Sequence, residues 1–191
     1  MPAPLISRDQ VAQRLFDAFR TYGFEGATLA RLSEATGLGR ASLYHYFPGG
    51  KDDMAREVIA LAHKWVNDNV RAPLAQRTLA PSIRVNAAFH NLIRGYDNGF
   101  ASCVVNLMGV GDAHGVVGKE LEELARAYVS AFESFLRSIG IARVKASRIA
   151  LETVMQVEGA LVMARALNDR DVFLERIEAI AQQYLALVRK E

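Results

Sequence analysis

A short segment near the N-terminus concentrates side chains that could bind nucleic acid. Four of them can donate hydrogen bonds to phosphate oxygens or to the edges of bases: Arg40, Ser42, Tyr44 and His45. Leu43 and Phe47 lie four residues apart, which puts both on one face of a helix. The pattern predicts a short helix that buries one face in a core and presents polar groups on the other.

A tight turn between two short helices must hold this polar face in place. Thr28 is suited to cap the first helix, and Gly37 can adopt the positive φ that the turn needs. Ala35 is small where the two helices have to approach each other. The spacing therefore predicts a helix-turn-helix over 28–47, in which backbone amides at Thr28 and Lys51 supply further phosphate contacts.

The segment Thr28–Phe47 reads TLARLSEATGLGRASLYHYF and is followed by Lys51. It resembles the TetR family of transcriptional regulators, and the resemblance is strong over about residues 8–60. What the resemblance implies is a DNA-binding domain in which the polar face described above contacts the duplex. It adds three residues to the expected DNA contacts: Arg31, Gly39 and Ala41.

Two departures from the family pattern stand out. Gly39 and Ala41 occupy positions where the family more often has Ser and Gly, which changes the readout of bases but not the docking. The step Pro48-Gly49-Gly50 is one residue longer than usual. Three features are similar to those of the LmrA/YxaF-like branch of the family: this longer step, Cys103 and the segment 158–165.

Composition and periodicity predict an all-α protein. Of its 191 residues 51% are hydrophobic, and apolar positions recur at helical rather than alternating spacing. We expect a three-helix DNA-binding domain over 6–66 and a larger helical domain over 67–191. Residues 99–118, which glycines interrupt, are expected to be loop around one short helix. Long helices are expected over 119–139, 144–167 and 170–190.

The resemblance implies that the larger domain binds a small hydrophobic effector and forms dimers. Apolar and polar residues at helical spacing are the candidate lining of the effector site: Phe89, His90, Ile93, Tyr96, Phe100, Cys103, Leu107, Met108, Phe132, Phe135, Met155, Glu158 and Gly159. Any single one of them is more often ordinary core. Glu158 falls in an apolar run, and a buried carboxylate needs a partner. Its partner is either the ligand or an arginine, Arg165 or Arg94.

The last two helices carry more apolar residues than one neighbouring helix could cover. We expect a two-fold homodimer through these residues: Val154, Leu161, Val162, Phe173, Ile177, Ile180 and Tyr184. Such a dimer would place two recognition helices about 34–36 Å apart, or a multiple of that, on double-stranded pseudopalindromic DNA.

Other kinds of chemistry are not favoured. His90, Cys103, Asp112 and His114 lack the spacing of a structural zinc site. Cys103 is the only cysteine, so it lacks the resolving partner of a redox switch. No nucleophile triad or carboxylate pair follows from the spacing. The sequence therefore predicts no enzyme activity, no metal and no cofactor.

Two functions remain open at this point. The first is a ligand-responsive, homodimeric repressor of operator DNA. The second is a helical small-molecule-binding protein or enzyme that no longer binds DNA, because residues 1–71 carry 9 Lys and Arg against 8 Asp and Glu and show no basic footprint. No apolar run reaches the roughly 18 residues of a membrane span, and a lone cysteine is typical of a reducing compartment. We therefore expect a cytoplasmic protein with no membrane contact.

Overall fold

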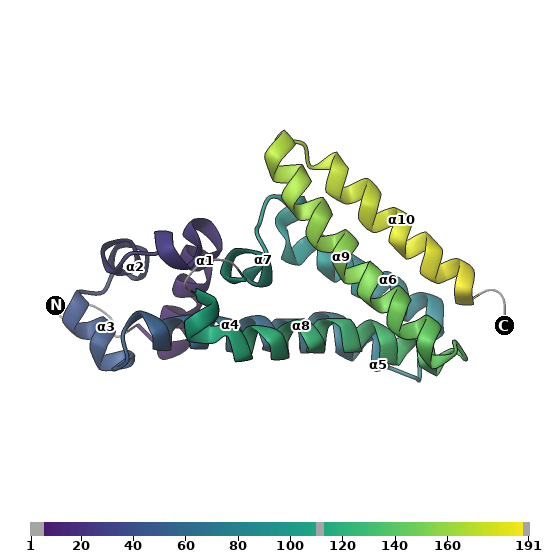
Figure 1. Cartoon of the computed structure of the whole chain (residues 1–191), viewed down its shortest axis with the longest axis horizontal. Helices are drawn as coiled ribbons and strands as arrows, with labels where there is room; N and C mark the ends of the chain where they lie inside the picture. The colour runs from purple at the N-terminus through teal and green to yellow at the C-terminus, as the bar shows by residue number, and fades with distance from the viewer. Residues whose placement is uncertain (1–5, 110–112, 189–191) are drawn as a thin grey trace. The chain divides into compact units, whose positions relative to one another are not determined.

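The computed structural model describes residues 6–109 and 113–188, and helices joined by short turns account for nearly all of them (Figure 1). No strand occurs among these described residues, which confirms the all-α prediction. The chain divides into two compact units. One draws on Met1–Ala62 and Val104–Leu124, and the other on His63–Cys103 and Ala125–Glu191. This differs from the contiguous division after residue 66, because a segment from the middle of the chain belongs with the N-terminal helices.

The first unit begins with α1 (Arg8–Gly26), whose entry is a capping box. The Ser7 hydroxyl accepts from the Gln10 amide at 3.2 Å, and the Gln10 side chain accepts from the Ser7 amide at 3.1 Å. Gly23 is a natural C-cap residue, so the sequence predicts that a first helix ends there, and the regular helix is indeed interrupted at Gly23, where φ is 68°. α2 (Leu29–Thr36) and α3 (Arg40–Tyr46) follow, and both are short.

Three further elements complete the first unit. They are the greater part of α4 (Lys51–Val66), the short helix α7 (Val104–Met108) and the start of α8 (Ala113–Ser138). α7 packs against α1. The glycine-rich stretch before residue 119 was expected to be loop, but α8 already begins at Ala113. A Cβ added at Gly115 would meet nothing within 4 Å, whereas one added at Gly118 would lie 3.2 Å from the ring of His114.

The second unit is built from longer helices. After α4 the chain makes one π-helical turn (Asn67–Arg71) and then α5 (Ala72–Ala75). The apolar spacing predicts a helix from Pro81 to about Asn98, but α6 (Pro81–Gly95) ends three residues earlier, before a 3-10 turn over Asp97–Gly99. The rest of α8, together with α9 (Arg143–Leu167) and α10 (Asp171–Val188), completes the unit. α10 packs against both α9 and α6 (Figure 1).

Aromatic rings fill the centre of the second unit. The Tyr184 ring lies 5.4 Å from that of Phe89 and 5.8 Å from that of Phe132, measured between centroids, with both pairs edge to face. Phe135 stacks on the other side of Tyr184 at 6.1 Å. The Tyr184 hydroxyl reaches the hydroxyl of Thr153 at 2.9 Å, so the polar end of this buried ring is satisfied.

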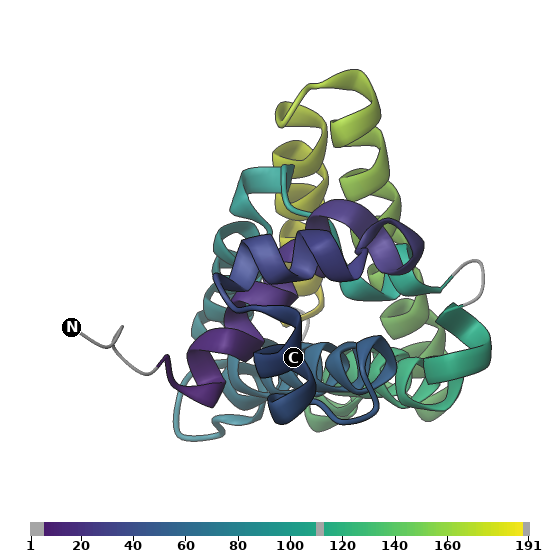
Figure 2. The same cartoon turned by 90° about the vertical axis from the view of Figure 1, so that its left-hand side faces the viewer.

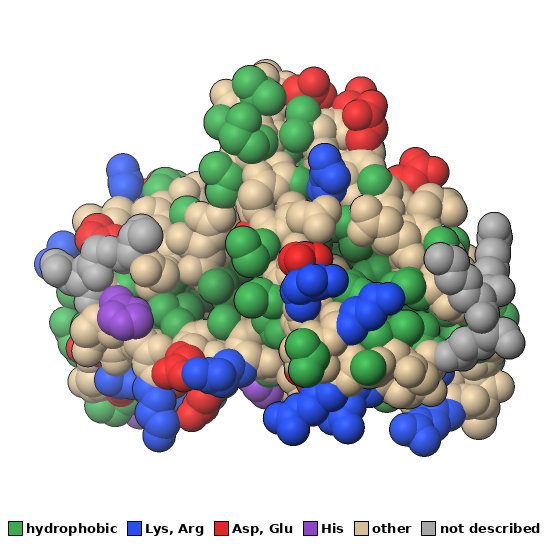
Figure 3. All heavy atoms as spheres, turned by 45° about the vertical axis from the view of Figure 1, so that its right-hand side comes forward, with side chains coloured by type: hydrophobic (Ala, Val, Ile, Leu, Met, Phe, Trp, Pro, Cys, Tyr) green, Lys and Arg blue, Asp and Glu red, His purple; other side chains and the backbone are tan. Residues whose placement is uncertain are grey.

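The surface carries charged side chains of both signs, interspersed with apolar ones, on the face that Figure 3 shows. Within the described residues, no helix is long and apolar enough to cross a membrane. The same residues contain no group of three or more His, Cys, Asp or Glu that could hold a metal ion. Asp112, which the sequence raised as a metal-ligand candidate, lies outside the described part of the chain.

The packing of Trp65 on Gly95 gives a test of the second unit. A Cβ added at Gly95 would overlap the indole ring of Trp65, the only tryptophan of the chain. We expect Gly95→Ala to lower the free energy of unfolding by about 1–3 kcal/mol, because the half-buried indole must move. Its tryptophan emission should also shift to longer wavelength. Urea denaturation followed by fluorescence measures both quantities.

Gly115→Ala is the matched control, because a Cβ there meets nothing within 4 Å. It should leave the emission unchanged and should not destabilise the protein, since alanine is favoured over glycine inside a helix. Equal stability of the two variants would contradict the packing described.

Candidate nucleic-acid interface

The turn between α2 and α3 is fixed by backbone geometry and by side chains that bind the backbone. Gly37 closes α2 in the left-handed region, with φ 71° and ψ 14°, where a β-carbon would be strained. The Thr36 hydroxyl donates to the Leu32 carbonyl at 2.7 Å, and the Ser33 hydroxyl donates to the Leu38 carbonyl. From α1, Arg14 Nη1 donates to the Thr36 carbonyl at 2.7 Å. These bonds set the direction in which α3 leaves the turn.

Burial of one face of α3 exposes the other. Leu43 and Phe47 are 0% and 1% exposed, as their spacing predicts. Ala35 is exposed rather than packed between the helices, so the close approach expected at that residue is wrong. Figure 2 turns α2 and α3 toward the viewer. Eight of the nine residues expected to contact DNA are exposed in the structure: Thr28, Arg31, Gly39, Arg40, Ala41, Ser42, Tyr44 and His45.

Two of these side chains are held by their neighbours. The Thr28 hydroxyl caps α2 by accepting from the Arg31 amide at 3.3 Å. Arg31 Nη1 donates to the Gly26 carbonyl at 2.9 Å, and its guanidinium lies 4.5 Å from the centroid of the Tyr22 ring. The helical spacing of Tyr22 with Val11 and Leu15 predicts that Tyr22 lies on the buried face of α1, but it is 44% exposed. Its contact with Arg31 could have been found only from the packing.

The side chains of Arg40 and Ser42 make no hydrogen bond or ion pair with any residue that the structure describes. Tyr44 is 46% exposed, and its ring faces the backbone at Gly50. A β-carbon at Gly50 would lie 3.1 Å from Tyr44 Cε1, and Gly50 itself has φ 67°. The polar groups of α3 are therefore available to an outside partner, while the ring of Tyr44 lies against the backbone at Gly50.

Lys51 is half-buried, which makes it the exception among the nine. Its ammonium lies 4.3 Å from the centroid of the Phe24 ring, a contact that holds the side chain without neutralising it. Lys51 is also the first residue of α4, where the positive end of the helix dipole favours an anion. The positive charge of Lys51 and the positive end of the α4 dipole therefore favour an anion at the same place.

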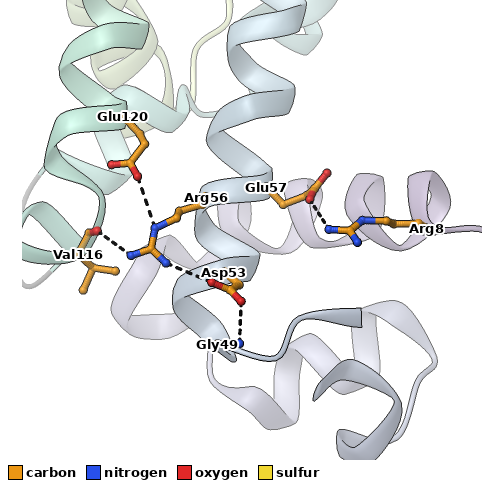
Figure 4. A network of polar contacts seen from close by, with 7 residues as sticks. All are labelled: Arg8, Gly49, Asp53, Arg56, Glu57, Val116 and Glu120. Carbon is orange, nitrogen blue, oxygen red and sulfur yellow. Dashed lines mark hydrogen bonds and ion pairs between the residues drawn. The ribbon is translucent and has the colours of Figure 1, made fainter. Parts of the chain in front are cut away.

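An ion-pair network supports the start of α4 (Figure 4). Asp53 accepts from the Gly49 amide at 2.6 Å and from Arg56 Nη1 at 3.2 Å. Arg56 also reaches Glu120 of α8 at 3.4 Å and the Val116 carbonyl at 3.4 Å. The network occupies the carboxylate of Asp53 and fastens the first turn of α8 to the same helix that carries Lys51.

The residues expected to line an effector site do not come together as one set. Within the second unit Phe89, Tyr96, Cys103, Phe132 and Phe135 are buried, and Ile93 and Glu158 are half-buried. Leu107 and Met108 belong to the first unit. Four others are exposed in the single chain, so their place in a lining stays a prediction: His90, Phe100, Met155 and Gly159.

A buried polar cluster connects Tyr96, Cys103 and Glu158 with Tyr128, which sequence reasoning did not single out. The Tyr96 hydroxyl donates to Cys103 Sγ at 3.6 Å. Burial raises the pKa of Tyr96 well above its ordinary value, and the neighbouring Cys103 raises it further. Burial likewise raises the pKa of Tyr128, with Glu158 as the next cause. Both phenols therefore stay neutral hydrogen-bonding groups at any physiological pH.

Arg165, one of the arginines raised as a partner of Glu158, donates to the Leu161 carbonyl at 3.1 Å and to the Ser102 hydroxyl. The choice between a ligand and an arginine as the partner of Glu158 stays a prediction. Glu158 belongs to the cluster around the two tyrosines.

The expected dimer residues are mostly core of the single chain. Only Val162 among them is exposed, at 39%. The other six are at most 9% exposed, because α9 and α10 bury these faces against each other and against α6: Val154, Leu161, Phe173, Ile177, Ile180 and Tyr184. They are not available to a partner, so this part of the sequence prediction is wrong.

Comparison with known proteins relates the N-terminal helices to a family of bacterial regulatory proteins. Residues 15–58 match the family model described as bacterial regulatory proteins, tetR family. The chain is 37% identical over 70 residues to the HTH-type transcriptional repressor AcnR of Corynebacterium efficiens, a match that covers 35% of this chain and 37% of AcnR. It is 21% identical over 189 residues to the HTH-type transcriptional regulator YxaF of Bacillus subtilis, covering 97% of this chain and 96% of YxaF.

A solved structure shares the fold along most of the chain. It is the TetR family regulator CifR in complex with 26-base-pair double-strand operator DNA, with a TM-score of 0.76, 24% identity and coverage of 93% of this chain and 97% of CifR. Residues 15–58, which include the helix-turn-helix, therefore match the TetR family, and the chain shares the fold of one of its members along most of its length.

The contact between Gly50 and Tyr44 gives a test of the interface. We expect Gly50→Ala to cost about 1–2 kcal/mol of stability, because a β-carbon is strained at positive φ, and to displace the ring of Tyr44. Gly39→Ala is the control, since a Cβ there meets nothing within 4 Å, and it should cost about 0.5 kcal/mol or less. Urea denaturation checks the difference. The same loss in both variants would show that Gly50 is not constrained.

Proposed function

We propose that this regulator is a repressor that binds operator DNA as a homodimer and is released by a small effector. The observation that carries the proposal is the exposed polar face of α3, whose anchors Leu43 and Phe47 leave Arg40, Ser42 and Tyr44 directed outward. An arginine at the start of a recognition helix can read guanine through two hydrogen bonds in the major groove. Lys51 and the first turn of α4 suit a phosphate.

The near-neutral charge of the first 71 residues is compatible with this function. Several acids there are already engaged: Asp53 binds Arg56 and the Gly49 amide, and Glu57 binds Arg8 at 3.0 Å. Arg40 and Lys51 have no such acidic partner among the described residues. The near-neutral sum therefore leaves Arg40 and Lys51 without an ion-pair partner among the described residues.

An exposed apolar row on α9 supports a dimer. Val144 is 85% exposed, Leu151 51%, Met155 62% and Val162 39%. They follow one another at seven, four and seven residues, which is a single stripe on a helix. Apolar side chains are visible on the face in Figure 3, including the protruding end where α9 meets α10. Gly159, with nothing within 4 Å of an added Cβ, would let a second helix approach this stripe closely.

The effector part of the proposal is supported by the buried polar cluster of the second unit. A pocket for a small hydrophobic ligand combines an apolar lining with a few polar groups that orient the ligand. The aromatic core around Phe89 and Phe132 and the neutral phenols of Tyr96 and Tyr128 supply both kinds of group. α4 and α8 each contribute residues to both units, so a ligand that displaces either helix could alter DNA binding. By linkage, DNA must weaken effector binding by the same factor.

Substitutions on the DNA-facing surface test the proposed binding mode. Lys51→Ala should weaken binding to every sequence alike and reduce the salt slope by about 1, because one phosphate contact is lost. Arg40→Ala should cost about 1–3 kcal/mol and relax preference at particular base positions. Selection of sites from random duplex DNA, followed by titrations at several salt concentrations, measures both effects. Lys119→Ala, an exposed lysine of α8, is the control and should bind like the parent; wild-type binding by all three variants would sink the proposal.

Charges placed in the α9 stripe test the dimer. The double variant Met155→Glu, Val162→Glu should sediment as a monomer at micromolar concentration, because burying two carboxylates in an apolar interface is costly. Its operator affinity should fall on the order of a hundredfold, as expected when two half-sites are no longer bound by linked modules. Asn86→Glu, an exposed change on α6, should remain dimeric. A double variant that stays dimeric would show that the interface lies elsewhere.

A further inference from the structure

A cavity of about 180 Å³ lies in the second unit, apart from the buried polar cluster. It is smaller than the roughly 300–1,000 Å³ typical of pockets for drug-sized ligands. Its wall has an apolar part formed by Leu74, Ala75, Ala131 and Phe135. The polar part consists of three arginines and two serines: Arg71, Arg77, Arg84, Ser134 and Ser138.

Arg84 is the least exposed of the charged groups, with 5% of its surface accessible. Its Nε donates to the Leu74 carbonyl at 2.7 Å, and Nη2 donates to the same carbonyl and to Ser138 Oγ at 3.3 Å. The guanidinium lies 4.8 Å from the centroid of the Phe135 ring. Nη1 makes no hydrogen bond with any residue that the structure describes, so two N–H donors of a rigidly held guanidinium remain for a ligand.

Arg71 and Arg77 add positive charge to the same wall. Arg71 ends the π-helical turn, and its Nε donates to Asn67 Oδ1 at 3.0 Å and its Nη2 to the Ala127 carbonyl at 3.1 Å. Such turns occur frequently at functional sites. Arg77 is exposed, and after burial its charge is the next cause that lowers the pKa of Arg84. The two guanidinium groups therefore repel each other.

No acidic residue offsets these charges. The cavity wall contains no Asp or Glu, and none of the three arginines forms an ion pair within the described residues. A buried charge without a counter-ion is unfavourable. An anion in the cavity would relieve both the desolvation of Arg84 and its repulsion with Arg77.

We propose that this cavity binds a small organic carboxylate, with its carboxylate on Arg84 and Arg77 and its apolar part against Phe135 and Leu74. Arginine presents paired N–H groups that match the two oxygens of a carboxylate. The hydroxyl of Ser134 at the exposed rim can donate a further hydrogen bond. An effect of this anion on operator affinity rests on the proposed repressor function, whereas the binding itself does not.

Butyrate is a suitable probe, and the neutral amide butyramide and inorganic phosphate serve as comparisons. Each is titrated into the full-length ¹⁵N-labelled protein without DNA, at constant ionic strength. We expect butyrate to cause saturable shifts of backbone amides over residues 71–77 and 131–138, and butyramide to cause none. Tighter binding of phosphate than of butyrate would assign the site to an inorganic oxyanion and would overturn the carboxylate.

Charge variants locate the binding. Arg77→Glu should raise the dissociation constant for butyrate about tenfold or more, because a charge-assisted contact becomes a repulsion. Arg137→Glu, an exposed change on α8 outside the cavity wall, should stay within about twofold. Arg84→Lys keeps the charge but loses the fork and should also weaken binding. If that variant does not fold, Arg77→Glu decides alone, and unchanged butyrate binding in it overturns the site.

Operator titrations with and without butyrate separate the two proposals. Butyrate binding with unchanged DNA affinity would leave the carboxylate site intact and remove its regulatory role. If the parent protein does not bind DNA, the repressor proposal is refuted, whereas the result of the anion titrations still stands.

Discussion

The functional surface depends on how a helix of seven residues is held in place. An isolated helix as short as α3 is unstable in water, because its nucleation cost is never recovered. Leu43 and Phe47 supply the missing stability by filling the core of the first unit. Neighbouring segments add to this: the Tyr46 hydroxyl donates to the Ile6 carbonyl at 3.0 Å, and Arg8 lies 5.3 Å from the centroid of the Phe47 ring. The face opposite these anchors is consequently exposed and also rigidly oriented.

The second unit contains buried polar groups of two kinds, one neutral and one charged. Around Tyr96 and Tyr128, burial keeps both phenols neutral, so the cluster can offer hydrogen bonds without carrying the cost of ionised phenols. Around Arg84 the charge is retained, because a guanidinium does not lose its proton in a protein. The first arrangement suits the polar part of a hydrophobic ligand, and the second suits an anion. The two sites are therefore chemically distinct within one helical unit.

α9 shows how one helix can serve two apolar surfaces. Leu161 and Val157 are fully buried against the rest of the unit, while Met155 and Val162 on another face are exposed. A helix with apolar residues on both faces is stable only if something covers the second face. A two-fold partner is the simplest cover, since one stripe can pack against its own copy.

The sequence by itself determined the helix-turn-helix. Thr28 as a cap, Gly37 at positive φ and the spacing of Leu43 and Phe47 are local features, and local features depend on residues only a few positions apart. For the same reason the existence of the long helices was predicted well. The start of α8 was missed, because the glycines before residue 119 favour loop locally, whereas the contacts of Arg56 with Glu120 and with the Val116 carbonyl join residues far apart in the sequence.

Tertiary structure alone decided which apolar residues face the core and which face a partner. Periodicity marks Leu161 and Val162 as equally apolar, but it does not say which of them another helix covers. For the same reason the sequence could not show that Met155 is exposed. It also could not show that Arg71, Arg77 and Arg84, which lie in a π-helical turn, a loop turn and α6, line the same cavity. The sequence shows that an arginine is charged. Its burial and the absence of an acid beside it follow from how distant segments pack.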